Sequence, residues 1–298
     1  MPRYALELEF AGAAFNGTQV QDHGRTLQGV VAQTLVDLVG HSVDLRPGSR
    51  LDQGVSARAL PSDVRLDRDW DPVVLGLALN QKLPKDIIVR RVAVVADGFD
   101  ARRDSVAKAY RYRVLVRPTR PVLDHAALWI RHLPHPERLA DLAALIPGRH
   151  DLSGFACLRH DETDVKDPVR DYLTARWSAQ PCGDEADGSE YTFRIRGAGF
   201  LYKQVRGLVG AMVHVAAGRA TVDDFMRAMA DGRAATRLAN IAPAEGLLLE
   251  RAEFTPEPDW RVVDPRGRVT SPRSLSGIAS EDGDADRMTD PRRRNEPR

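Results

Sequence analysis

Residues 48–57 read GSRLDQGVSA, and this segment carries the most unusual chemistry of the chain. It follows a strand-like run. Arg50 and Asp52 stand two positions apart, so an extended backbone would place both side chains on one side. Pairing with Arg50 would hold Asp52 ionised, and an ionised, oriented carboxylate is a nucleophile. The same spacing fits a surface salt bridge beside a turn at Gly54. The segment alone leaves both roles open.

A second segment, residues 108–113, reads KAYRYR and alternates bases with aromatic residues on a predicted strand. Tyr110 and Tyr112 share one face with Lys108, while Arg111 and Arg113 face the other side. Aromatic and basic side chains on one sheet suit stacking on a nucleobase and contact with phosphates. The alternative is a core position for the tyrosines and a solvated position for the arginines.

A third segment, residues 200–207, reads FLYKQVRG at the predicted start of a helix. Lys203 and Arg206 lie about one turn apart there. Free backbone N–H groups at a helix start, together with an arginine, suit an anionic partner.

The rest of the chain alternates strands with helices. We predict strands over residues 4–10, 87–96, 110–116, 172–178 and 191–196, and helices over 27–38, 71–82, 136–146, 200–217 and 221–230. The first strand reads as half-buried, because polar residues alternate with apolar ones. This pattern indicates the α+β class, with antiparallel sheets covered by helices on one side. Since Asp104-Ser105 separates two such sets of elements, we expect two α/β halves, 1–105 and 106–260.

Composition and charge narrow the functional classes. The 298 residues are 43% apolar and 29% charged, which is typical of a globular protein. With 43 basic and 42 acidic residues the net charge is +1, so any nucleic-acid site must be a local patch. Two cysteines, Cys157 and Cys182, are too few for a disulfide framework or a cysteine-based zinc site. No signal peptide or membrane span is evident, so we expect a cytoplasmic protein without membrane contact.

The final segment, residues 261–298, differs from the rest. Only 8 of its 38 residues are apolar and none is aromatic, so we predict a disordered tail. Neither GxxxxGK[ST], nor GxGxxG after a strand, nor GxSxG occurs in the chain. Nucleotide-phosphate binding and serine-hydrolase chemistry therefore have no support.

Taken together, these segments resemble the TruA-type tRNA pseudouridine synthases from about residue 4 to about residue 254. Nine motifs follow one another in the family's order: FNGTQVQ at 15–21, RTLQG at 25–29, RLDQGVSA at 50–57, LNQKLPKDI at 79–87, FDAR at 99–102, KAYRY at 108–112, HDLSGF at 150–155, FLYKQVR at 200–206 and EGL at 245–247. One such match would be weak evidence, but nine in order are strong evidence.

The resemblance implies a pseudouridine synthase fold, with two α/β halves, antiparallel sheets and a cleft between them. It implies an isomerase without metal or small-molecule cofactor, which detaches uracil from its ribose and rejoins it through carbon 5. Asp52 would be the nucleophile, Arg50 would orient it, Arg206 would hold it from the other side, and Tyr110 would stack on the uracil. The partner would be tRNA, bound across a homodimer and modified at uridines 38 to 40 of the anticodon arm.

The chain departs from the family pattern at five positions near these motifs. They are Thr18 in place of Trp, Leu51 in place of Thr, Gln53 in place of Ala, and Ser56 and Asp100 in place of His. These changes leave two alternatives open. One is a pseudouridine synthase with a shifted RNA target, and the other is a catalytically weak tRNA-binding chaperone. The retained Asp52 argues against the second.

Overall fold

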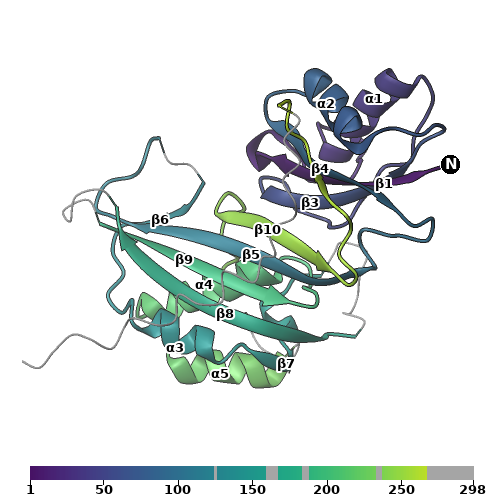
Figure 1. Ribbon diagram of the computed structural model, residues 1–298. Coiled ribbons are helices and arrows are strands. Elements are labelled where there is room, and N and C mark those ends of the chain that lie inside the picture. The colour runs from purple at the N-terminus through teal and green to yellow at the C-terminus, as the bar shows by residue number, and fades with distance from the viewer. Residues whose placement is uncertain (124–125, 159–166, 183–187, 233–236, 267–298) are drawn as a thin grey trace, which may run out of the picture.

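The computed structural model describes residues 1–123, 126–158, 167–182, 188–232 and 237–266. Within these ranges eleven strands form one sheet, most of whose pairs are antiparallel (Figure 1). In sheet order the strands are β11 (Arg261–Val262), β4 (Ile87–Val95), β1 (Arg3–Phe10), β3 (Ser56–Arg65), β10 (Leu247–Phe254), β5 (Ser105–Val116), β9 (Ser189–Gly197), β8 (Val169–Pro181) and β7 (Gly148–Asp151), with β2 (Arg46–Pro47) beside β3 and β6 (Leu128–Ile130) beside β5. The α+β class expected from the sequence is confirmed.

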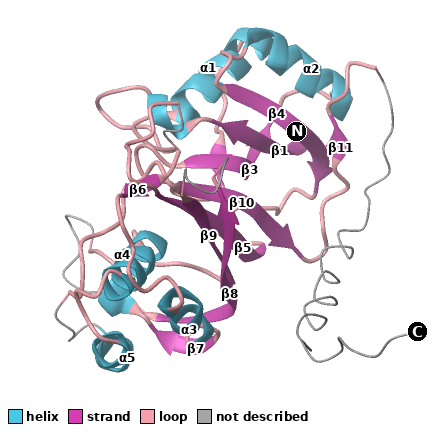
Figure 2. Cartoon of the chain, turned by 90° about the vertical axis from the view of Figure 1, so that its left-hand side faces the viewer, coloured by secondary structure: helices cyan, strands magenta, loops and turns pink. Residues whose placement is uncertain are grey.

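The described part of the chain contains five α-helices, which cover the two parts of this sheet. Helices α1 (Leu27–Val39) and α2 (Pro72–Lys82) lie over the part built from β1, β3 and β4. Helices α3 (Arg138–Ala144), α4 (Gln204–Ala216) and α5 (Val222–Asp231) lie over the part built from β5, β8 and β9, as Figure 2 shows from another side. None of the described helices is long and apolar enough to cross a membrane.

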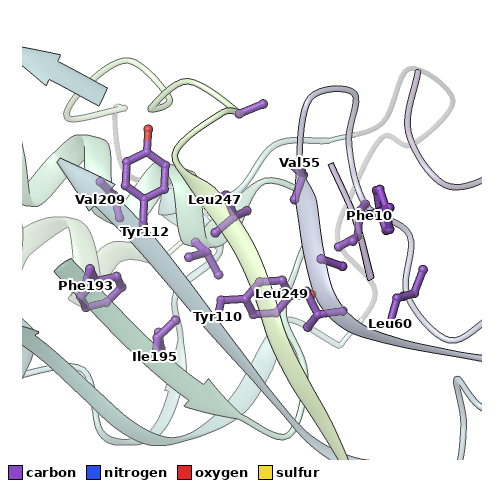
Figure 3. Packing of buried hydrophobic residues seen from close by; sticks show 14 of the residues in the cluster. Phe10, Val55, Leu60, Tyr110, Tyr112, Phe193, Ile195, Val209, Leu247 and Leu249 are labelled. Atoms are coloured by element: carbon purple, nitrogen blue, oxygen red, sulfur yellow. The ribbon is translucent and has the colours of Figure 1, made fainter. Parts of the chain in front are cut away.

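Strand β10 joins the two parts. It pairs in parallel with β3 at Leu248–Ser56 and Leu249–Ala57, and antiparallel with β5 along most of its length. One hydrophobic core follows from this junction: Leu60 of β3, Leu249 of β10 and Tyr110 of β5 belong to the same buried cluster (Figure 3). The loop that precedes β3 therefore lies where the two halves meet.

The first strand is buried on both faces, which corrects its prediction as half-buried. Ala5 is fully buried and Glu7 is 5% exposed. Phe254 and Trp260 pack with Ala5 on the face that the sequence pattern assigned to solvent. Glu7 is paired there with Arg91, whose Nε lies 2.8 Å from Glu7 Oε1.

Residues 261–266, which the sequence analysis assigned to a disordered tail, have a defined structure. Arg261–Val262 form β11 against Val92 and Arg91 of β4, and the Val263 N–H donates to the Arg90 carbonyl at 2.9 Å. Residues 261–266 are thus part of the fold, because the open edge of β4 supplies hydrogen bonds that composition does not reveal. Residues 267–298 lie outside the described residues.

Helix starts follow the sequence closely, with one exception. The Thr26 hydroxyl accepts a bond from the Gly29 N–H and caps α1, and Asp71 caps α2 in the same way. Helix α4 begins at Gln204, four residues later than predicted, because Lys203 adopts a left-handed backbone conformation with φ of 59°. Residues 200–203 form an irregular turn instead, and this turn borders the cleft described next.

Candidate active site

Asp52 lies in the loop between β2 and β3, and the core anchors this loop on both sides. Leu51 and Val55 are buried members of the main hydrophobic cluster. The Asp52 carbonyl accepts a bond from the Val55 N–H at 3.2 Å, which closes a turn at Gly54, where φ is 84°. The turn expected at Gly54 is present, and it leaves the Asp52 side chain 18% exposed at a cleft.

Arg206 holds the Asp52 carboxylate from the opposite half of the molecule. Arg206 Nη1 lies 2.7 Å from Asp52 Oδ2, and the two side chains are only 13% and 18% exposed. The Arg206 Nε donates to the Ala242 carbonyl at 2.8 Å, so the guanidinium is itself fixed. A charge-assisted bond between partly buried groups fixes the direction of the carboxylate.

The cleft in front of Asp52 has a volume of about 900 Å³. Four segments that are distant in sequence line it: residues 13–21, 50–54, 202–206 and 243–245. Three basic side chains (Arg50, Lys203 and Arg206) face two acidic ones (Asp52 and Glu245) among these segments. Most of the remaining polar lining consists of amide side chains, which suits the hydrogen-bonding edges and phosphates of a nucleotide.

The predicted pairing of Arg50 with Asp52 is not among the ion pairs of the residues that the structure describes. The prediction assumed a strand, in which residues two apart share a face. Residues 48–55 instead form a loop, so that alternation does not apply. Arg50 is exposed and lines the cleft, and the ion pair to Asp52 is made by Arg206.

Tyr110 lies in the core beside Asp52. The residue is 8% exposed, and its ring packs edge-on against Phe200, with ring centroids 5.1 Å apart. The pKa of the Tyr110 hydroxyl is raised to about 12: burial is the main cause, the Ser49 side chain lowers the pKa, and the charge of Asp52 raises it. The hydroxyl therefore keeps its proton at neutral pH, and Tyr110 is not among the described residues that line the cleft in front of Asp52.

Among the neighbours of Tyr110 on β5, one is buried in the core and two form ion pairs. Tyr112 is fully buried and its hydroxyl donates to the Pro243 carbonyl at 2.8 Å, so the core alternative holds for this residue. Arg111 and Arg113 face the other side and pair with Glu250 and Glu190.

Lys108 contributes a contact that the sequence analysis missed. Its Nζ donates to the Gly48 carbonyl at 2.8 Å, so β5 supports the loop that carries Asp52. Burial lowers the pKa of this ammonium group to about 8, and the charge of Arg102 adds to that effect. The available signal was the face that Lys108 shares with Tyr110.

The five departures from the family pattern occupy different environments. Leu51 is buried in the core, and Gln53 is exposed on the cleft wall. The Ser56 hydroxyl accepts a bond from the Gly12 N–H, and the Asp100 carboxylate accepts bonds from the N–H groups of Arg102 and Arg103. Thr18 is buried against the Asp52 loop.

Among the described residues, no group of three or more His, Cys, Asp and Glu side chains is placed to hold a metal ion. The chemistry that this part of the chain can supply is that of an oriented carboxylate in a polar cleft, next to a protonated tyrosine.

Comparison with known proteins finds tRNA pseudouridine synthases. A family model described as tRNA pseudouridine synthase matches residues 142–255. A protein of Agrobacterium fabrum named tRNA pseudouridine synthase A is 32% identical over 273 residues, which cover 90% of this chain and 96% of the relative. Its namesake in Thermus thermophilus is 36% identical over 260 residues, covering 86% and 98%. A third protein of that name, from Caulobacter sp., is 33% identical over 253 residues, covering 84% and 96%.

Proposed function

Because this chain belongs to the TruA-type tRNA pseudouridine synthase family, whose members are isomerases that convert uridine into pseudouridine, we propose that it modifies uridines 38 to 40 in the anticodon stem-loop of tRNA, with Asp52 as the nucleophile. The observation that carries the proposal is the 2.7 Å contact between Arg206 and Asp52 at the cleft. A nucleophilic carboxylate must be correctly aimed, and this ion pair supports that condition.

The proposed reaction rearranges bonds within one nucleotide. The target uridine leaves its stack and enters the cleft, since the glycosidic bond is otherwise out of reach. Asp52 attacks either the ribose or the uracil ring. The bond between C1′ and N1 breaks, a bond between C1′ and C5 forms, and a proton passes from C5 to N1. The reactant and product have the same composition, so no oxidant, reductant or group donor is consumed.

The cleft residues supply binding and positioning in this scheme. Arg50 and Lys203 line the cleft from opposite halves and carry positive charge toward the RNA backbone. We assign Tyr110 to the inner side of the target site, where its ring supports the base and its protonated hydroxyl is available as a donor. The family resemblance supports a homodimer that binds tRNA across both subunits, and a tRNA substrate supports a cytoplasmic location.

A shifted RNA target is the second candidate, and Gln53 favours it. This side chain is exposed on the cleft wall next to Asp52, where the family pattern has alanine. An added amide at that point changes the hydrogen bonds available to the target or a neighbouring nucleotide. The chaperone alternative has less support, because a chaperone has no need of an oriented Asp52–Arg206 pair.

The test is a map of pseudouridine in defined transcripts. The full chain is incubated with unmodified tRNA that carries uridines at 38, 39 and 40 and elsewhere, and pseudouridine is located position by position. A transcript with cytidine at all three positions is the control. We expect modification at 38 to 40 only, and none in the control. Modification at other sites alone would favour the shifted target, and no pseudouridine in any tRNA would refute the proposal.

A further inference from the structure

Thr18 is a cleft residue whose hydroxyl is turned toward the Asp52 loop. It is 1% exposed, which is unusual for a polar residue in a loop. Three hydrogen bonds connect it to the segment before Asp52. The Thr18 Oγ1 donates to the Ser49 carbonyl at 3.1 Å and accepts from the Leu51 N–H at 3.0 Å. The Thr18 N–H donates to the Leu51 carbonyl at 3.2 Å.

These bonds fix the residue that immediately precedes Asp52 at both of its backbone groups. A single hydroxyl acts as donor and acceptor at once, which among side chains of this size only serine and threonine can do. The neighbouring Gly17 is in close approach: a Cβ there would lie 2.8 Å from the Leu51 carbonyl oxygen. The two loops are therefore packed together at their backbones, and Thr18 bridges them.

Two backbone hydrogen bonds connect the start of helix α1 to Thr18 and its neighbour Gly17. The Gln28 N–H donates to the Thr18 carbonyl at 2.9 Å, and the Leu27 N–H donates to the Gly17 carbonyl at 3.2 Å. These N–H groups belong to the first turn of the helix, where they have no partner within it. A continuous set of bonds thus runs from a rigid helix through Thr18 to the backbone at Leu51.

We propose that Thr18 is a positioning residue for the isomerisation, which sets the backbone at Leu51 so that the Asp52 carboxylate meets Arg206 and the substrate in the reactive direction. This inference rests on the proposed role of Asp52 as the nucleophile. Loss of the hydroxyl leaves the Ser49 carbonyl and the Leu51 N–H without their partner in a buried site. The loop must shift to satisfy them, and small displacements of a reacting group lower turnover strongly.

Three variants of the full chain test this inference. Thr18→Val keeps the shape of the side chain and removes the hydroxyl, whereas Thr18→Ser keeps the hydroxyl and removes only the methyl group. Thr34→Val is the matched control, because Thr34 is also buried in the N-terminal half and its hydroxyl donates to the Val30 carbonyl within α1. The measurements are kcat, KM and melting temperature, with the tRNA transcript that the wild type modifies best.

We expect Thr18→Val to lower kcat by about 10- to 100-fold while KM changes by less than about three-fold. Thr18→Ser should stay within about three-fold of wild-type kcat, because it rebuilds both bonds. Thr34→Val should lower only the melting temperature. The inference is overturned when Thr18→Val keeps wild-type kcat, when Thr34→Val loses as much kcat, or when Thr18→Ser fails to restore turnover.

Backbone hydrogen exchange gives a second measurement, which is informative even where Thr18→Val folds poorly. In the wild type and in Thr18→Ser, the Leu51 amide should exchange slowly, and exchange as fast as that of an open loop would overturn the inference. Failure of the proposed function has a different signature: the wild type itself would form no pseudouridine. An active wild type with an unaffected Thr18→Val would remove this inference alone.

Discussion

At the scale of single residues, the contact between Asp52 and Arg206 joins side chains that are 154 positions apart in sequence. Asp52→Asn removes the charge and keeps the shape. We expect turnover on tRNA to fall below a few per cent of wild type, because an amide is not a nucleophile of this kind, with tRNA binding nearly unchanged. Single-turnover kinetics together with a binding titration check this. Substantial residual turnover would exclude Asp52 from the nucleophilic role.

The two arginines of the cleft should separate in their kinetic effects. Arg206→Lys keeps the charge but loses the planar fork that bonds both Asp52 and the Ala242 carbonyl, so we expect kcat to fall by about ten-fold or more. Arg50→Gln removes a charge from the exposed cleft wall, so KM should rise and kcat at saturating tRNA should stay close to wild type. Added salt should reproduce the effect of Arg50→Gln but not that of Arg206→Lys.

Lys108 provides a pH-dependent test of the buried support beneath the Asp52 loop. Burial lowers the pKa of its ammonium group to about 8 in the folded chain, from an ordinary value of 10.5. Between these values the unfolded chain binds more protons than the folded one, so this group makes the fold more stable as pH rises through that window. Below about pH 8 Lys108 is charged in the folded chain as well, and the full cost of burying that charge lowers the free energy of unfolding.

Compared with Lys108→Met, the wild type should therefore gain stability from pH 8 to pH 10. Thermal or denaturant unfolding of both proteins across this pH range measures the difference in their free energies of unfolding. Other titrating groups contribute equally to both proteins, so their contributions cancel in this difference. A constant difference between the two proteins would show that Lys108 keeps its ordinary pKa.

At the scale of elements, the sequence predicted the helices better than the central strands. Residues such as Thr26 and Asp71 mark helix starts by local chemistry, since both side chains accept hydrogen bonds from N–H groups of the first turn. Strand β3 was missed because Pro61 interrupts it and six consecutive residues are buried, so neither alternation nor composition identifies a strand. Its pairing with β1, β2 and β10 decides its conformation, and these partners are far away in sequence.

The candidate site was predictable to a similar degree. Asp52 and Arg206 were found from the motifs, and their expected contact is present. The predicted pairing of Arg50 with Asp52 assumed an extended backbone, which residues 48–55 do not adopt, and it is not among the ion pairs of the described residues. The support from Thr18 was not visible, because it joins two loops through backbone groups that carry no sequence signal. For Lys108 the available signal was the face that it shares with Tyr110, which does not reveal its bond to the Gly48 carbonyl.

The turn after Asp52 can be tested with a pair of glycines. Gly54 and Gly40 both adopt φ of 84°, but an added Cβ at Gly54 would lie 3.2 Å from Ala244 Cβ, whereas Gly40 has open space. Replacement by alanine should destabilise both variants by about 1 kcal/mol, because L residues resist this conformation. Only Gly54→Ala should also lower kcat. Equal kcat in both variants would argue that the turn does not position Asp52.

At the scale of the whole molecule, the cleft exists because β10 returns from the second half to join β3 of the first half. Residues 243–245, which precede this strand, form one wall of the cleft, and the loop before β3 forms another. Asp52 reaches Arg206 only when both halves share one sheet. The continuous core through Leu60, Leu249 and Tyr110 makes the halves fold together, so stability and catalysis depend on the same junction.

The C-terminal boundary of the fold gives the last prediction. Trp260 is 4% exposed and covers the second face of β1, and residues 261–263 bond to β4. A chain ending at residue 266 lacks seven basic and six acidic residues, a net charge of only +1, so tRNA affinity and its salt dependence should barely change.

A chain ending at residue 256 exposes Ala5 and Ala93, and its free energy of unfolding should fall by several kcal/mol, because loss of a buried tryptophan side chain costs about 3–5 kcal/mol. Trp260→Ala in the full chain separates loss of the ring from loss of the strand, and should account for most of the drop in melting temperature. Should the chain ending at 266 be as unstable as the one ending at 256, the boundary of the folded unit would lie beyond residue 266, and β11 would be one part of a longer structured segment.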